Sequence, residues 1–373
     1  MSRTTNAAPP APPAPFWPAP TDSDADRAGR YQRQRAIPRE LWPLLALLLL
    51  LLFNYFFTPG FFQTEVREGR LYGILIDVAD RAAPIMLLAI GMTLVIATGG
   101  VDLSVGAVMA ISGAIAAHLV AEREQPLWLA LLAALGVSLL AGVWNGTLVA
   151  YLRVQPIVAT LILMVSGRGI AQIVGAREGQ IIEIPPADHP GFAMIGNGSF
   201  LGLPFTLTLV AVAFIVVALL TRKTAAGLFI EAVGNNRVAS RFAGINERLV
   251  TVTVYALTGL CAGVAGLIAA SDINASDANN AGLNLELDAI LAVVLGGTAL
   301  TGGRFYLLGA MIGALIIQTM TTTILTRNVP VELTLVVKAI VVVVVCLLQA
   351  PAFRDAILRP LRRGRMQISG GGA

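Results

Sequence analysis

The chain has 373 residues, of which 56% are hydrophobic and 13% are charged, and its formal net charge is +4. Soluble domains carry about 25% charged residues, so this composition predicts an integral membrane protein with many helices. Two of the 26 basic residues are lysines, and the arginines lie at the edges of apolar runs, which favours membrane topology over nucleic-acid binding. Both cysteines, Cys261 and Cys346, lie within apolar runs, so no disulfide is expected.

Residues 1–40 are rich in Pro and Ala and then in Arg, and they show no periodic apolar face, which predicts a disordered tail. Residues 41–350 form the expected transmembrane domain, and 351–373 a basic tail. The fold class expected is an all-α membrane protein with about ten transmembrane helices. The expected spans are 41–57, 73–98, 103–121, 127–151, 156–175, 204–221, 249–270, 286–302, 305–326 and 332–350. The long loop 176–203, with its prolines, is expected to be irregular.

The distribution of arginine predicts the orientation. Both tails, Arg153, the segment 222–248 and Arg304 fall on one side of the expected membrane, whereas the opposite loops have few bases or balance them with acids. By the positive-inside rule, both termini are expected to be cytoplasmic, in a multi-pass protein of the bacterial inner membrane.

The stretch from Gly91 to Gly113 is almost wholly apolar and contains one acid. Two apolar runs meet in it, and we expect the double glycine at the junction to form a turn, with the acid and a serine in the first turn of the next helix. The residues singled out here are Gly99, Gly100, Asp102, Ser104 and Gly106. The pattern recurs at Gly296-Gly297, which leaves open an internal duplication or a chance likeness of glycine-rich turns.

Several activities lack the residues they need. No Gly-Lys-Ser/Thr sequence is present, so the chain has no P-loop for ATP hydrolysis, and we expect no catalytic residues, no metal site and no cofactor. Acids and histidines are also scarce at mid-span, which disfavours a proton- or sodium-coupled carrier. A passive channel, a secondary carrier and a membrane scaffold remain alternatives at this point.

The segment 222–248 is the expected docking site for a partner that supplies energy. Val238, Phe242 and Ile245 are spaced as one apolar stripe of a short helix, with Gly234 breaking the chain before it and Gly244 capping it. Such a helix fits a groove on a soluble domain or lies on the membrane surface, and the pattern alone does not choose between them.

Three separated motifs resemble the permease subunits of bacterial monosaccharide ABC importers of the ribose, xylose and galactose type. They are GMTLVIATGGVDLSVG, GVWNGTLVAYLRVQPIVATL followed by SGRG, and EAVGNNRVASRFAGI, and the resemblance covers about residues 60–350. The later segment SDANNAGLNLELDAILAVVLGGTALTGGRF looks like the galactofuranose branch of this family.

The resemblance implies the permease fold of the branched-chain amino acid and sugar type, importing a monosaccharide such as galactofuranose. It also implies an ATP-binding subunit, a second permease (a sister chain or an identical copy), a periplasmic sugar-binding protein and no nucleic acid. Ribose- or xylose-type transport is the alternative. Residues 222–248 then form a cytoplasmic coupling loop. Its matching positions are Glu231, Ala232, Gly234 and Gly244, and Phe242 is expected to join them in coupling to the ATPase.

Because sugars are neutral and rich in hydroxyls, the path needs polar side chains rather than charge. The residues expected near it are Asn145, Gln155, Thr160 and Arg168. For each, a hydrogen bond between helices is the simpler explanation.

Overall fold

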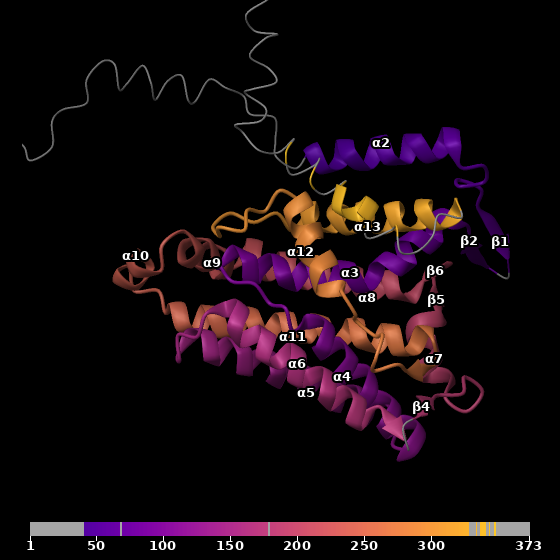
Figure 1. The fold of residues 1–373 in the computed structure, drawn as a ribbon, viewed down its shortest axis with the longest axis horizontal. Helices are drawn as coiled ribbons and strands as arrows, with labels where there is room; N and C mark the ends of the chain where they lie inside the picture. Colours follow the sequence, from indigo (N-terminus) through magenta and orange to yellow (C-terminus); the bar gives the residue numbers. More distant parts are fainter. Residues whose placement is uncertain are drawn as a thin grey trace, which may run out of the picture. The chain divides into compact units, whose positions relative to one another are not determined.

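The computed structural model describes residues 41–67, 69–177, 180–327, 333, 336–340, 343 and 347. Helices dominate this part of the chain, and most of them lie side by side in one bundle (Figure 1). The helices are α2 Leu41–Phe57, α3 Ile74–Ala97, α4 Val105–Ala117 with a π-helical turn His118–Glu122, α5 Leu127–Ala150, α6 Pro156–Val174, α7 Pro190–Asn197, α8 Phe205–Lys223, α9 Ala226–Asn235, α10 Arg237–Phe242, α11 Glu247–Asp272, α12 Leu285–Leu295 and α13 Leu307–Thr326.

Seven helices in the described ranges are long and apolar enough to cross a membrane: α3, α4 with its π-helical turn, α5, α6, α8, α11 and α13. Each coincides with an expected span to within a few residues. The first expected span is also a helix, α2, but its 17 residues are at the lower limit for crossing. Most of the last expected span, 332–350, lies outside the described residues.

The expected span over 286–302 is wrong. The helix found there, α12, has 11 residues and ends at Leu295. At 1.5 Å per residue it is about 16 Å long, roughly half of the hydrocarbon thickness. The apolar run continues through Gly296-Gly297, where the backbone turns, so hydropathy joined a short helix to the turn that follows it.

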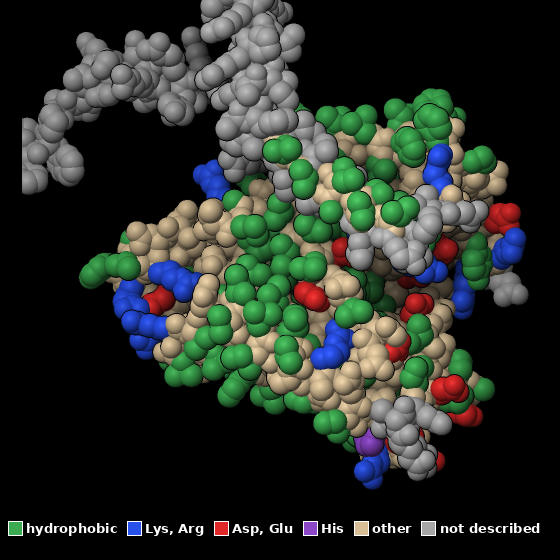
Figure 2. Space-filling view, in the orientation of Figure 1, with side chains coloured by type: hydrophobic (Ala, Val, Ile, Leu, Met, Phe, Trp, Pro, Cys, Tyr) green, Lys and Arg blue, Asp and Glu red, His purple; other side chains and the backbone are tan. Residues whose placement is uncertain are grey.

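The buried centre of the bundle is made by α3, α4 and α11, whereas α2, α5, α6 and α8 expose long rows of Leu, Ile and Val. Glycine lets α11 approach its neighbours closely: a Cβ on Gly142 of α5 would lie 2.3 Å from the carbonyl oxygen of Tyr255. Small residues pack helices in this way where burial of apolar surface gives no driving force. Figure 2 shows a broad band of hydrophobic side chains, with basic side chains gathered at the α10 end. This band is the expected lipid-facing surface.

Short strands lie at the end of the bundle opposite α10 (Figure 1). The strands are β1 Glu65–Arg67, β2 Arg70–Tyr72, β3 Ala176–Arg177, β4 Gln180–Glu183, β5 Ser199–Phe200, β6 Leu203–Pro204 and β7 Ala275–Ser276. β1 pairs with β2 and β5 with β6, while β4 lies between β3 and β7, and all pairs are antiparallel. The loop 176–203 is therefore more ordered than expected, since it holds a hairpin and α7 as well.

The two glycine turns that echo each other in sequence end their helices with the same cap. After α3, the N–H of Gly99 donates to Ile96 O and the N–H of Gly100 to Val95 O. After α12, the N–H groups of Gly297 and Thr298 make the same two bonds, to carbonyl oxygens three and five residues back. Gly99 and Gly297 both have positive φ, +76° and +91°, as this C-terminal motif requires. In the sequence pattern Gly99 corresponds to Gly296, whereas in the backbone geometry it corresponds to Gly297.

Candidate functional site

The connection between α3 and α4 gathers several of the residues expected to matter. Gly99 makes the turn, and a Cβ on Gly100 would lie 2.7 Å from the hydroxyl oxygen of Tyr255, so the chain runs tightly against α11 here. α4 begins at Val105, so Asp102 and Ser104 precede the helix rather than occupying its first turn.

Asp102, Ser104 and Asn145 form a buried polar chain. The Asp102 carboxylate, 2% exposed, accepts hydrogen bonds from the N–H (2.9 Å) and the hydroxyl (2.6 Å) of Ser104. The Nδ2 of Asn145 on α5 donates to the Ser104 hydroxyl at 2.8 Å. Asn145 Oδ1 is left without a partner among the described residues. The hydrogen bonds that are made hold the turn against α5, since breaking them would leave further buried groups unpaired.

Two further helices contact the carbonyl oxygen of Val101, next to Asp102. Thr160 Oγ1 on α6 lies 3.4 Å from it and the Tyr255 hydroxyl on α11 lies 3.5 Å from it, both at the long end for hydrogen bonds. Thr160 donates its one hydroxyl hydrogen to Pro156 O, at 2.9 Å within its own helix, so its contact with Val101 O is one of packing. The turn is thus held by α5, α6 and α11 together.

Replacing Asp102 with alanine is expected to destabilise the protein by about 1–3 kcal/mol, because two donors of Ser104 lose their acceptor. Asp102→Asn keeps an oxygen in place and is expected to lose less. Thermal unfolding of the purified chain in nanodiscs measures both, with Asp188→Ala, in an exposed turn, as control. Equal losses for alanine and asparagine would show that the charge, rather than the acceptor, stabilises the turn.

Arg168 and Gly106 lie apart from this turn and contact the loop before α12 instead. Arg168 Nη1 donates to Ala281 O (2.5 Å) and Ala278 O (3.3 Å). A Cβ on Gly106 would lie 2.3 Å from Gly282 O. It would also lie 2.5 Å from Oε2 of Glu286, a buried oxygen without a partner in the described chain. Gln155 joins neither group, since it lies exposed at the start of α6.

The segment 222–248 forms two helices rather than one. α9 runs through Gly234 to Asn235, so the expected break at Gly234 is wrong, and the break comes at Asn236. Gly244, with φ +83°, ends α10 as expected: its N–H donates to Arg241 O, and that of Ile245 donates to Ser240 O.

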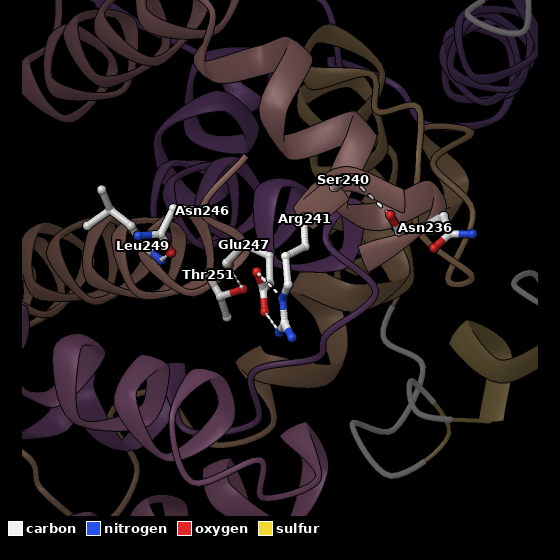
Figure 3. A network of polar contacts seen from close by, with 7 residues as sticks. All are labelled: Asn236, Ser240, Arg241, Asn246, Glu247, Leu249 and Thr251. Atoms are coloured by element: carbon white, nitrogen blue, oxygen red, sulfur yellow. Dashed lines mark hydrogen bonds and ion pairs between the residues drawn. The ribbon is translucent and has the colours of Figure 1, made fainter. Parts of the chain in front are cut away.

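Side-chain bonds hold α10 against the start of α11 (Figure 3). Asn236 accepts from the N–H of Ala239 and Asn246 from that of Leu249, so each asparagine caps the helix that follows it. Arg241 pairs with Glu247 across the intervening turn. The side-chain hydrogen bond from Arg241 to Glu247 raises the pKa of the Arg241 guanidinium. Phe242 is 88% exposed at the tip. The segment is a compact unit with an apolar side chain displayed at its end.

This unit is fitted directly onto the C-terminal end of α3. A Cβ on Gly234 would lie 1.8 Å from Ala97 O and 2.6 Å from the N of Gly303, so only glycine allows the approach. Arg237 Nη2 donates to Thr98 O at 3.1 Å, and Gly303 N donates to Ala97 O at 2.8 Å. These bonds satisfy carbonyl groups that the end of a helix leaves unpaired. Any displacement of α9 and α10 therefore acts on α3.

A cavity of about 640 Å³ lies at the other end of α3. Its lining comes mainly from the first turns of α3, the ends of α11 and α13, and the loop before α12, with Met109 of α4 and Thr206 of α8. None of the residues expected near the path lines it. Asp77 and Asp80, two acids at the start of an apolar run, are the sequence signal that could have indicated this cavity. Within the described ranges, no three His, Cys, Asp or Glu side chains are placed to hold a metal ion.

The family model for the permease component of the branched-chain amino acid transport system matches residues 74–346. The chain belongs to this family. The match includes the α3–α4 turn, the segment 222–248 and all the spanning helices found here. The protein is therefore a permease of the kind found in ABC importers, a transport component of the inner membrane rather than an enzyme. ATP hydrolysis takes place on a separate subunit, and a substrate-binding protein completes such systems.

Curated relatives of the permease are sugar transporters. The galactofuranose transporter permease of Escherichia coli K12 is 55% identical over 322 residues, 85% of this chain and 92% of that protein. A fructose import permease of Bifidobacterium longum is 41% identical, over 84% of this chain and 88% of that one. The ribose import permease of Escherichia coli K12 is 35% identical, over 86% and 96% of the two chains. No solved structure matches the permease.

Proposed function

We propose that this chain is a transmembrane permease subunit that carries galactofuranose, or a sugar very similar to it, into the cell. One observation carries the choice of sugar: identity falls from 55% with the galactofuranose permease to 41% with a fructose and 35% with a ribose permease, at nearly equal coverage. By the same comparison of sequence identities, ribose-type transport is the weaker candidate.

The membrane-embedded part of this proposal comprises residues 41–350, with cytoplasmic tails at 1–40 and 351–373. Both ends of the chain and the segment 222–248 are rich in arginine. The positive-inside rule therefore favours a cytoplasmic location for all three. A second permease, identical or a sister chain, would complete the path.

In this proposal, residues 222–248 bind the ATP-binding subunit. Glu231, Ala232 and Phe242 supply the docking face, while Gly234 lets the same segment pack against the end of α3. α3 has 24 residues and spans about 36 Å, so it joins the docking segment to the cavity at its other end. Closure of the ATPase pair then shifts α9, α10 and α3 together and changes access to the cavity.

The residues expected near the path have structural roles in this mechanism rather than contacts with the solute. Asn145 and Thr160 hold the α3–α4 turn, so that movement of α3 is transmitted to α4 rather than absorbed by the loop. Gly106 and Arg168 hold the loop 277–282, which forms one wall of the cavity. Gln155 is exposed at the start of α6 and receives no role here, since its side chain makes no hydrogen bond to another described residue.

Reconstitution tests the proposal. The permease with its ATP-binding subunit, its partner permease and its binding protein is placed in proteoliposomes, and uptake of galactofuranose, fructose and ribose is measured with and without ATP. We expect ATP-dependent uptake with galactofuranose preferred at least tenfold. Uptake without ATP, or a preference for ribose, would overturn the mechanism or the choice of sugar, respectively.

A further inference from the structure

The larger cavity, at the N-terminal end of α3, is lined by many acidic side chains for a bundle that is otherwise apolar. Four carboxylates line it, from Asp77, Asp80, Asp272 and Asp277, and Arg81 is the one basic side chain among its described lining residues. Asp80 bonds to Thr206, and Asp277 accepts from the N–H groups of Asn279 and Asn280. The Asp77 and Asp272 side chains have no such partner in the described part of the chain. The described lining therefore carries more acidic than basic side chains, with four of one kind and one of the other.

The rest of the lining suits a neutral, hydroxyl-rich solute. Gln318, Thr321 and Thr322 on α13 offer amide and hydroxyl groups, while Met109, Ile268 and Leu285 supply an apolar wall. Gln318 is 9% exposed, and the one hydrogen bond of its side chain to another described residue, to Thr322 Oγ1, is long at 3.4 Å. Its amide is therefore free to exchange that bond for one to a solute. Ligand sites typically have this size and this mixture of apolar surface with few polar groups.

A smaller cavity of about 340 Å³ adjoins the first and shares Arg81, Gln318 and Thr321 with it. Its own carboxylate, Asp288, is paired with Lys338 at 2.9 Å. The unpaired negative charge thus belongs to the larger cavity. The carboxylates there are spread around the walls and do not converge as metal ligands would, since no group of three such side chains within the described residues is placed to hold a metal ion.

We propose that the larger cavity is a solute-binding site and a charge filter, which admits neutral polyhydroxylated solutes and excludes anionic ones such as sugar acids and sugar phosphates. Like charges repel strongly where burial lowers the effective dielectric constant, so an anion entering between these carboxylates is disfavoured. This inference rests on the proposed sugar transport, but it adds that the permease itself discriminates by charge.

Thiol modification tests the filter without ATP and without transport. Thr321→Cys is made in a chain whose native cysteines are serine, and the assembled complex is placed in nanodiscs. The rates of a cationic and an anionic methanethiosulfonate reagent are measured and divided by their rates with a free thiol. We expect the normalised ratio to favour the cation at least tenfold, and the double variant Asp77→Asn, Asp272→Asn to bring it near one. Asp188→Asn, an exposed acid outside the cavity lining, is the matched control.

Protection by solutes tests the binding site. Millimolar neutral sugar should slow both reagents, whereas galacturonate should protect only the double Asp→Asn variant. A normalised ratio near one in the parent chain, protection by calcium but not by sugar, or equal protection by galacturonate would each overturn the proposal. Uptake by the unsubstituted complex is measured in parallel. If another neutral sugar is transported, it replaces the probe, so failure of the choice of sugar is distinguished from failure of the filter.

Discussion

Replacing Gly234 with alanine is expected to uncouple ATP hydrolysis from transport. The added methyl group would lie 1.8 Å from Ala97 O and 2.6 Å from the N of Gly303, both backbone atoms that cannot rotate away. The segment must therefore separate from α3, which also breaks the Arg237 bond to Thr98 O. Overpacking of this kind costs about 1–3 kcal/mol, so we expect solute uptake to fall at least tenfold while the reconstituted complex still hydrolyses ATP.

Gly136→Ala is the matched control, because a methyl group at that helical position of α5 meets no atom within 4 Å. It should leave uptake and hydrolysis unchanged. Arg237→Gln provides a milder break of the same contact and should give an intermediate loss. Normal uptake by Gly234→Ala, with the chain inserted at normal levels, would show that transport does not depend on this approach.

Replacing Gly106 with alanine is expected to destabilise the protein by separating the start of α4 from the loop before α12. Its methyl group would lie 2.3 Å from Gly282 O, so α4 and the loop before α12 must move apart. Glu286 can rotate away, but a backbone carbonyl cannot. We expect a loss of about 1–3 kcal/mol, seen as a lower midpoint of thermal unfolding in nanodiscs.

The control for Gly106 is Gly169→Ala on α6, where the added methyl group has open space. An unchanged or slightly higher midpoint is expected there, since alanine favours helix over glycine. If Gly106→Ala unfolds at the same temperature as the unsubstituted chain, the close approach of α4 to Gly282 does not contribute to stability.

The sequence predicted most of the helices because their apolar runs are long and their ends carry recognisable residues. It predicted the turn at Gly99 and the cap at Gly244, which need left-handed backbone conformations. It overestimated the length of α12, because the apolar run continues through Gly296-Gly297 although the helix ends before them. It also placed a break at Gly234, where glycine serves instead to admit a neighbouring backbone inside a helix.

The candidate site was only partly accessible to sequence reasoning. The Asp102 turn could be found because an acid within so much apolar chain needs a partner. Its partner Asn145 was singled out as a path residue, whereas the structure uses it to hold the turn. The cavity joins Asp77 and Asp272, nearly two hundred residues apart, so only tertiary packing brings them together.

The central claim is that residues 222–248 face the cytoplasm, bind the ATP-binding subunit and transmit its movement through α3. Phe242→Cys, in a chain whose native cysteines are serine, tests it most directly, because this tip is highly exposed. A membrane-impermeant maleimide is applied to right-side-out and inside-out vesicles. The account predicts labelling of inside-out vesicles alone, with protection when the ATP-binding subunit is bound. Labelling of right-side-out vesicles would place the segment on the opposite side of the membrane and contradict the account.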